Sequence, residues 1–259
     1  MSRLIAITGK GGTGKTTLAA CLVRLLIENG TRPVLAVDAD PNSTLAPLLG
    51  MRLTPTISDI RQEVLESKSQ VTEITKERLL DQKIGECLQE ADGFDLLTMG
   101  RPEGPSCYCY VNNLLRRALS ILKANYRAVV VDNEAGMEHL SRMNTDAISC
   151  MALVSEPTLV SVRSVLRILE LSAALPVRVE RKAIVWNKVV GGGVPDKVRE
   201  MVADQPFDAE VCVPWLDAIA RLTALEESVL EAPPLPEACH QLLEACGLAR
   251  PAASRRARP

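Results

Sequence analysis

The segment Gly9-Lys-Gly-Gly-Thr-Gly-Lys-Thr-Thr17 decides the fold that the rest of the sequence is expected to adopt. It fits two glycine-rich motifs, the G-x-G-x-x-G of dinucleotide sites and the G-x-x-x-x-G-K-T of phosphate-binding loops. A dinucleotide site needs only glycines and a helix N-terminus, whereas Lys15 adds a cation for the β- and γ-phosphates and Thr16 a hydroxyl for Mg²⁺. The segment is therefore predicted to be a phosphate loop, with nucleotide contacts from Gly11, Gly12, Thr13, Gly14, Lys15, Thr16 and Thr17.

The runs on either side of the loop predict a β-strand before it and an α-helix after it. Residues 4–8 form a short apolar run, and residues 16–28 keep helical spacing up to Asn29-Gly30, a typical helix end. The alternation continues, with further strands expected at residues 33–38, 94–99, 128–132, 148–154, 182–186 and 210–213. This order predicts an α/β fold, a doubly wound and mainly parallel sheet with helices on both faces.

The composition fits one domain of this type. The 259 residues are 47% hydrophobic, which is enough to form a sizeable core, and no internal repeat or low-complexity linker interrupts them. We expect residues 1–249 to form the phosphate-loop domain. Residues 250–259 contain four Arg and no acidic residue, and they are expected to be a basic disordered tail.

Charge and cysteine content restrict the expected partners and compartment. A formal net charge of −2 and a pI near 5.9 argue against a protein held on nucleic acid by bulk electrostatics. The first residues lack the apolar core and cleavage site of a signal peptide, and no run of ~18 apolar residues appears. We expect a cytoplasmic protein without nucleic-acid or membrane partners, whose eight cysteines are core residues or metal ligands rather than disulfides.

Lys10 is a second lysine inside the loop, at a position that the general motif leaves open. A solvated loop cation is the simplest interpretation. However, residues 10–17 resemble the deviant Walker A motif of the MinD/ParA/nitrogenase-iron-protein class of P-loop ATPases. That resemblance implies a homodimer that hydrolyses ATP to ADP, in which Lys10 reaches across the interface to the partner's nucleotide and shares a catalytic role with Lys15.

Three carboxylates are predicted to end strands beside the phosphate loop. Strand alternation places Asp38 and Asp40 on the same side, facing the phosphates, although an Asx turn before Pro41 is the alternative. In the resembled class this segment is the first switch, which implies that Asp38 joins Thr16 around Mg(II) and that Asp40 orients the attacking water. Asp132 ends the run 128–132 and corresponds to the second acid on the metal side.

The resemblance also implies a second switch and a base site. Residues 133–136 correspond to the second switch, where Gly136 could turn a backbone N–H onto the γ-phosphate. Asn187, which is expected to follow a strand, fits the asparagine of the class that reads the adenine edge. Pro214 belongs to a segment that resembles the loop covering the base. A simple turn asparagine remains the alternative for Asn187.

Cys107 and Cys109 lie one residue apart, directly before a run with helical spacing. We expect them in the loop that enters an amphipathic helix, where a helix N-terminus or a metal lowers thiol pKa. Two thiolates are half of the four ligands of a closed zinc site, and a two-fold axis between identical chains would complete the set. Cys21, Cys150 and Cys212 lie in apolar runs and are expected in the core.

A longer set of segments resembles a narrower family, the CooC-type nickel-insertion accessory ATPases of carbon monoxide dehydrogenase. The segments are residues 10–17, 38–41, 100–105, 107–113 and 131–139, and the resemblance extends from residue 3 to about residue 245. It implies dimerisation that depends on ATP and metal, with Ni(II) or Zn(II) held between subunits by Cys107 and Cys109. It also implies delivery of nickel to carbon monoxide dehydrogenase as the client.

Other functions remain open on the sequence. Four thiolates from two chains could hold a [4Fe–4S] cluster as readily as a single ion. A MinD-like membrane positioner would require an amphipathic C-terminal helix with large apolar residues, and residues 250–259 contain none. A ParA-like DNA partitioner would require a basic face, which the net charge disfavours.

Overall fold

A computed structural model of the protein describes residues 2–52, 55–60, 73–101, 107–134, 147–174 and 177–248. For residues 73–77 and 107–109 it describes the backbone only. The expected tail and Gly136 lie outside these ranges.

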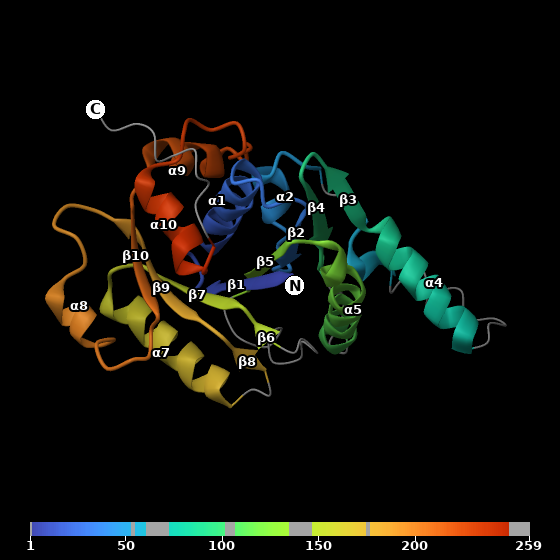
Figure 1. Ribbon diagram of the computed structural model, residues 1–259, viewed down its shortest axis with the longest axis horizontal. Helices are drawn as coiled ribbons and strands as arrows, with labels where there is room; N and C mark the ends of the chain where they lie inside the picture. Colours follow the sequence, from blue (N-terminus) through green and yellow to red (C-terminus); the bar gives the residue numbers. More distant parts are fainter. Residues whose placement is uncertain are drawn as a thin grey trace.

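An eight-stranded sheet forms the centre of the molecule, with strand order β10-β9-β7-β1-β5-β2-β4-β3 (Figure 1). The strands are β1 Arg3–Gly9, β2 Val34–Ala39, β3 Leu88–Ala91, β4 Phe94–Thr98, β5 Ala128–Asn133, β7 Cys150–Ser155, β9 Lys182–Val189 and β10 Ala209–Pro214. Every neighbouring pair is parallel except β3 and β4. The predicted doubly wound, mainly parallel sheet is confirmed.

Helices cover both faces of the sheet, as Figure 1 shows. They are α1 Lys15–Glu28, α2 Leu45–Leu48, α4 Glu73–Glu86, α5 Cys107–Leu122, α7 Leu159–Ala173, α8 Asp196–Glu200, α9 Asp217–Ala224 and α10 Glu237–Ala245. The core is divided accordingly, because alternate strand residues point to opposite faces. Ile5 and Ile7 of β1 pack with α1, α2, α9 and α10, whereas Leu4 and Ala6 pack with α5, α7 and α8.

The structure differs from the predicted strands in four places, one of which is the short strand β8 (Arg178–Val179) that was not predicted. The expected strand 148–154 divides at Ser149, whose N–H donates to Leu4 O at 2.9 Å, into β6 (Ala147–Ile148) and β7. β6 pairs with β8 in a separate two-stranded sheet. β3 was not predicted, because Leu88-Gln-Glu-Ala91 has neither apolar alternation nor β-branched residues and is an antiparallel edge strand. β9 extends beyond residue 186, so Asn187 lies within a strand rather than after it.

Two glycines bring the loop between β1 and α1 close to its neighbours. A Cβ on Gly9, whose φ is 153°, would lie 2.2 Å from Val154 O in β7. A Cβ on Gly14, whose φ is 89°, would lie 2.4 Å from Asn187 Nδ2 in β9. Val154 O belongs to the backbone and cannot move aside, so position 9 requires glycine; at position 14 the Asn187 side chain could move, but the positive φ still favours glycine. In open α/β sheets that edge is where ligands bind.

Candidate functional site

A cavity of about 800 Å³ opens at the carboxyl edge of the sheet. Most of its lining comes from four segments that are far apart in the sequence: the loop after β1 with the start of α1, the segment after β2, the end of β9, and the turn between β10 and α9 with α9 itself. Glu134 after β5 and Cys239 of α10 also line it. Among the residues predicted from sequence, the lining includes Gly11, Gly12, Gly14, Lys15, Thr16, Thr17, Asp40, Asn187 and Pro214. The volume is in the range of pockets that take a nucleotide-sized ligand.

The phosphate loop presents positive charge and backbone donors to this cavity. α1 begins at Lys15 directly after Gly14, which has no side chain to cap the helix, and its first turn contains no acidic residue. The N-terminal N–H groups of α1 are therefore not capped by a side chain there, and such groups favour an anion. Lys15 Nζ donates to Lys10 O at 3.3 Å, and Thr13 Oγ1 donates to the same carbonyl at 2.8 Å. Lys10 itself is exposed.

Asp132, near the end of β5, is a buried carboxylate with too few hydrogen-bond partners. Its side chain is fully buried, and within the described ranges neither carboxylate oxygen has a partner with hydrogen-bond geometry, although the Thr16 hydroxyl is close enough to lower its pKa. Burial, followed by the nearby charge of Asp38, raises the pKa of Asp132 from its ordinary 3.8 to about 8, while Thr16 and Lys15 act in the opposite direction. A buried polar group without partners is destabilising, and a bound divalent cation would supply the missing partner. The donor set therefore fits Mg²⁺.

Asp38 holds the segment that follows β2. It is fully buried, its Oδ1 accepts from Asp40 N at 3.1 Å, and its Oδ2 accepts from Leu45 N at 2.8 Å at the start of α2. Burial raises the pKa of Asp38 to about 7, although these backbone hydrogen bonds lower it in part. Asp38 thus ties the cavity wall formed by residues 40–45 to the sheet.

Asp40 forms the Asx turn that the sequence left open as an alternative. Its Oδ1 accepts from Asn42 N at 2.9 Å and from Asn42 Nδ2 at 2.8 Å. The side chain is half-buried and lines the cavity. In this conformation the carboxylate therefore shapes the turn, and it also lies at the edge of the space that a ligand would occupy.

The end of β9 contacts the phosphate loop directly. Asn187 Nδ2 donates to Thr13 O at 2.8 Å, so this amide contacts the loop from within a strand. Lys188 Nζ donates to Gly12 O at 2.6 Å and forms an ion pair with Glu156 Oε1 at 2.8 Å. Sequence reasoning missed Lys188 and Glu156, because an isolated Lys or Glu at a strand end carries no signal. The position of Lys188 beside Asn187 was the one available hint.

The predicted thiol pair lies at the start of α5, not in the loop before it. The helix begins at Cys107. The glycines and prolines before Cys107 had indicated that the loop continues past the cysteines, but the helical spacing extends back to Cys107. Positions 107 and 109 are about 200° apart around a regular helix axis. Their side chains are outside the described set, and within that set no group of three or more His, Cys, Asp or Glu could hold a metal ion.

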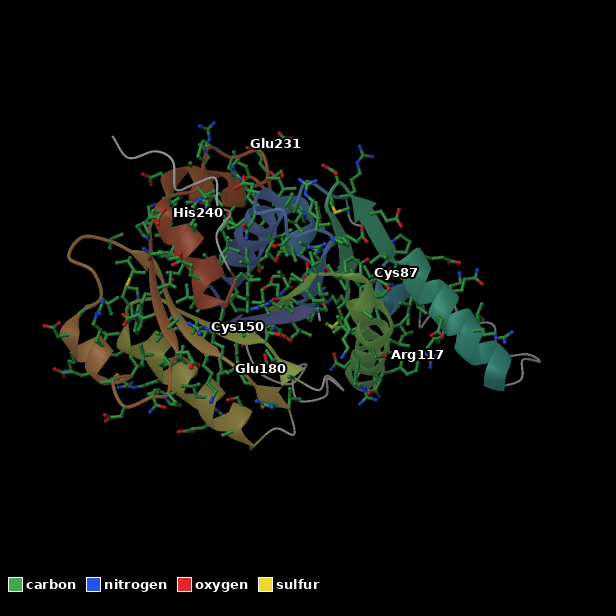
Figure 2. The ribbon with its side chains drawn as sticks, in the orientation of Figure 1. Cys87, Arg117, Cys150, Glu180, Glu231 and His240 are labelled. Atoms are coloured by element: carbon green, nitrogen blue, oxygen red, sulfur yellow. The ribbon has the colours of Figure 1, made fainter. Side chains whose placement is uncertain are left out.

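Four of the remaining cysteines form two buried pairs, Cys21 with Cys239 and Cys150 with Cys246, but within the described ranges neither pair gains a third metal-ligating residue. Figure 2 labels Cys87, Cys150 and His240 on separate elements. Cys21 and Cys150 are buried as predicted. Cys212 was predicted in the core but is only half-buried, because it lies on β10 at the edge of the sheet. Within the described ranges, no helix has both the length and the apolar character needed to cross a lipid bilayer.

The buried carboxylates make a prediction for the nucleotide-free protein: its stability should fall as the pH rises from about 4 to about 8. The folded pKa values of Asp38 and Asp132 lie above the ordinary 3.8, so in this range the folded state binds more protons than the unfolded state. Asp132→Asn removes one of the two groups. This variant should show a shallower decrease and exceed the wild type at pH 8 by more than about 1 kcal/mol.

Urea unfolding midpoints measured at intervals between pH 4 and pH 8 test this expectation. Asp204→Asn, at an exposed position in the turn that follows α8, is the matched control and should keep the wild-type pH dependence. The same pH slope in wild type and Asp132→Asn would contradict the assignment of a raised pKa to this carboxyl.

Comparisons with known proteins agree with this geometry. Residues 4–234 match the model of the CobQ/CobB/MinD/ParA nucleotide binding domain. An uncharacterized ATP-binding protein of Methanocaldococcus jannaschii is 41% identical over 72% of this chain and 74% of its own length. The carbon monoxide dehydrogenase accessory protein CooC of Rhodospirillum rubrum is 34% identical over 59% of this chain and 62% of its own length.

A solved structure has the same fold. The septum site-determining protein MinD of Pyrococcus horikoshii, in complex with Mg-ADP, superposes with a TM-score of 0.68 over 95% of both chains at 20% identity. The family match covers most of the described residues, including the phosphate loop and all four segments that line the cavity. The chain therefore belongs to the CobQ/CobB/MinD/ParA nucleotide binding domain family.

Proposed function

We propose that this protein binds Mg·ATP in the cavity at the carboxyl edge of the sheet and hydrolyses it. The observation that carries the proposal is the buried Asp132, whose carboxylate oxygens have no partner with hydrogen-bond geometry among the described residues and whose pKa responds to Lys15 of the phosphate loop. A cation bound beside the phosphate loop would pair with this buried carboxylate. In this proposal residues 1–249 form the ATPase domain, and residues 250–259 are a tail outside it.

Each part of the cavity then has a task. Lys15 leaves Lys10 O and binds the β- and γ-phosphates, together with the N–H groups of the loop and of the first turn of α1. Thr16, Asp38 and Asp132 hold Mg²⁺, which supplies positive charge to the phosphate oxygens. Asn187 and the turn at Pro214 contact the adenine.

Asp40 and Lys10 complete the reaction. Asp40 orients the attacking water once its Asx turn to Asn42 opens. Lys10 is exposed and free of the cavity wall, which suits a residue that crosses to the nucleotide of a second copy. In this proposal hydrolysis therefore requires an ATP-bound homodimer.

Two substitutions of Asp40 separate catalysis from turn formation. Asn can accept the same hydrogen bond from Asn42 N without a negative charge, whereas Ala cannot. We expect both Asp40→Asn and Asp40→Ala to keep ATP affinity and to lose ATP turnover by about 100-fold or more. Steady-state phosphate release and equilibrium binding of a non-hydrolysable analogue measure the two properties. Normal ATP turnover by Asp40→Asn would contradict the catalytic role of Asp40 and limit the residue to forming the Asx turn.

Variants of the two loop lysines are the companion measurements. Lys15→Ala should lose ATP binding, because Lys15 is the only buried cationic side chain among the described residues of the loop. Lys10→Ala should bind ATP and yet remain monomeric in sedimentation with the analogue. If Lys10→Ala still formed an ATP-dependent dimer, Lys10 would have to be interpreted as a solvated loop cation.

We further propose that ATP drives a metal carrier, which holds Ni(II) or Zn(II) between subunits and delivers nickel to carbon monoxide dehydrogenase. The support is the identity with CooC and the Cys107-Tyr-Cys109 segment at the start of α5. Thiolates suit both metals. Because positions 107 and 109 are on different sides of a regular helix, binding of one ion by both cysteines requires the first turn of α5 to open.

The metal proposal predicts one divalent ion per dimer. Metal analysis of the ATP-analogue-bound dimer should find this ratio, and Cys107→Ser and Cys109→Ser should each abolish binding while leaving monomeric nucleotide affinity unchanged. Cys212→Ser, at a half-buried position on β10, is the matched control. One tightly held ion per monomer would contradict a shared site. A broad visible absorption band of anaerobically purified protein would indicate an iron–sulfur cluster instead.

A further inference from the structure

Two consecutive residues at the end of β9 donate hydrogen bonds to two consecutive carbonyls of the phosphate loop. Asn187 Nδ2 reaches Thr13 O at 2.8 Å, and Lys188 Nζ reaches Gly12 O at 2.6 Å. In a regular strand, neighbouring side chains point to opposite faces of the sheet, so both could not reach the same loop. The local backbone of β9 has to be irregular for this arrangement to form.

The irregularity is a bulge. The pairing of β9 with β10 shifts: Trp186 is opposite Cys212, and Val189 is opposite Pro214, so Asn187 and Lys188 share the one residue Val213. Bulges redirect side chains and are frequent beside active sites. Lys188 also has a φ of 57°, which is unusual for a residue with a Cβ and strains the backbone. A strained backbone that aims a lysine at the phosphate loop points to a role in that loop.

Glu156 fixes the Lys188 ammonium from the other side. It follows β7, and its Oε1 lies 2.8 Å from Lys188 Nζ. The ammonium therefore joins the ends of β7 and β9 to the loop after β1. A charge-assisted hydrogen bond of 2.6 Å is strong enough to set the direction of a peptide carbonyl.

The carbonyl that Lys188 holds belongs to a peptide whose orientation matters for phosphate binding. The phosphate loop works by turning its N–H groups toward the ligand, so its carbonyls have to turn away. Gly12 has a φ of 83°, and among the described residues none beyond its two chain neighbours has an atom within 4 Å of the place its Cβ would occupy, so packing does not restrain it. Lys188 supplies the missing restraint.

We propose that Lys188, held by Glu156, is a positioning residue that keeps the Gly12 carbonyl turned outward, so that the phosphate loop has its binding shape before a nucleotide arrives. The inference rests on the proposed binding of ATP phosphates by this loop. Lys188 acts through the loop and does not contact the phosphates. Such preorganisation increases affinity because the loop loses less conformational freedom on binding.

The test is calorimetric titration of Lys188→Met with two probes at constant Mg²⁺, ADP and inorganic tripolyphosphate. Tripolyphosphate has no base or ribose, so it reports on the phosphate loop alone. Both affinities should fall by a similar factor of about 10 or more, and Lys188→Arg, which keeps a charged donor, should recover part of the loss. Lys197→Met removes a lysine from exposed α8 and should bind both probes like the wild type.

Lys188→Gly separates this role from a purely structural one. Glycine adopts a φ of 57° without strain, so urea unfolding should show a variant at least as stable as Lys188→Met. Its tripolyphosphate affinity should nevertheless fall as far as that of Lys188→Met.

Three outcomes would overturn the inference. Wild-type tripolyphosphate affinity in a folded Lys188→Gly would show that the loop does not need the ammonium. A loss confined to ADP would place the effect of Lys188 at the base or ribose. If the wild-type protein bound neither probe, the proposed function itself would fail and this inference with it.

Discussion

The close approach of the phosphate loop to β7 and β9 is the constraint on which the rest of this structure depends. It exists because Gly9 and Gly14 have no side chains, and a Cβ at either position would overlap Val154 O or Asn187 Nδ2. The approach places the N-terminus of α1 at the carboxyl edge of the central strand, where its N–H groups meet the cavity. The buried strands around it then supply carboxylates at the same edge.

Those buried carboxylates destabilise the nucleotide-free protein, and a ligand that neutralises them would gain binding free energy. Asp38 and Asp132 are opposite one another in the pairing of β2 with β5, so two buried acids share one region with Lys15. Asp38 uses backbone donors of the next segment, and Asp132 has none within the described ranges. In the proposed function, a ligand that carries a cation would satisfy Asp132 and would act on the segment that Asp38 holds. Binding at the phosphates would thereby be connected to residues 40–45.

Much of this fold could be predicted because its signals are local. The phosphate loop, the parallel strands and α1 follow from glycines and apolar periodicity within short windows. The signal fails where tertiary contacts decide: β3 is an edge strand without β-branched residues, and Ser149 interrupts an apolar run by bonding to Leu4. The bulge at Asn187 and Lys188 depends on pairing with β10, and Glu156 acquires its role only through the fold. The start of α5 at Cys107 was not predicted, because the preceding glycines and prolines are typical of a loop.

The proposed function requires that ATP binding and metal binding strengthen each other. If both favour the same dimer, each must tighten the other by the same factor, and hydrolysis must loosen the hold on the metal. The most direct measurement is the Ni²⁺ affinity of the protein without nucleotide, with ADP, and with a non-hydrolysable ATP analogue, in wild type and in Cys107→Ser. We expect the wild type to bind nickel most tightly with the analogue, and the variant to show no such dependence. Equal wild-type affinities in the three states would contradict the claim that ATP turnover controls the cysteine site.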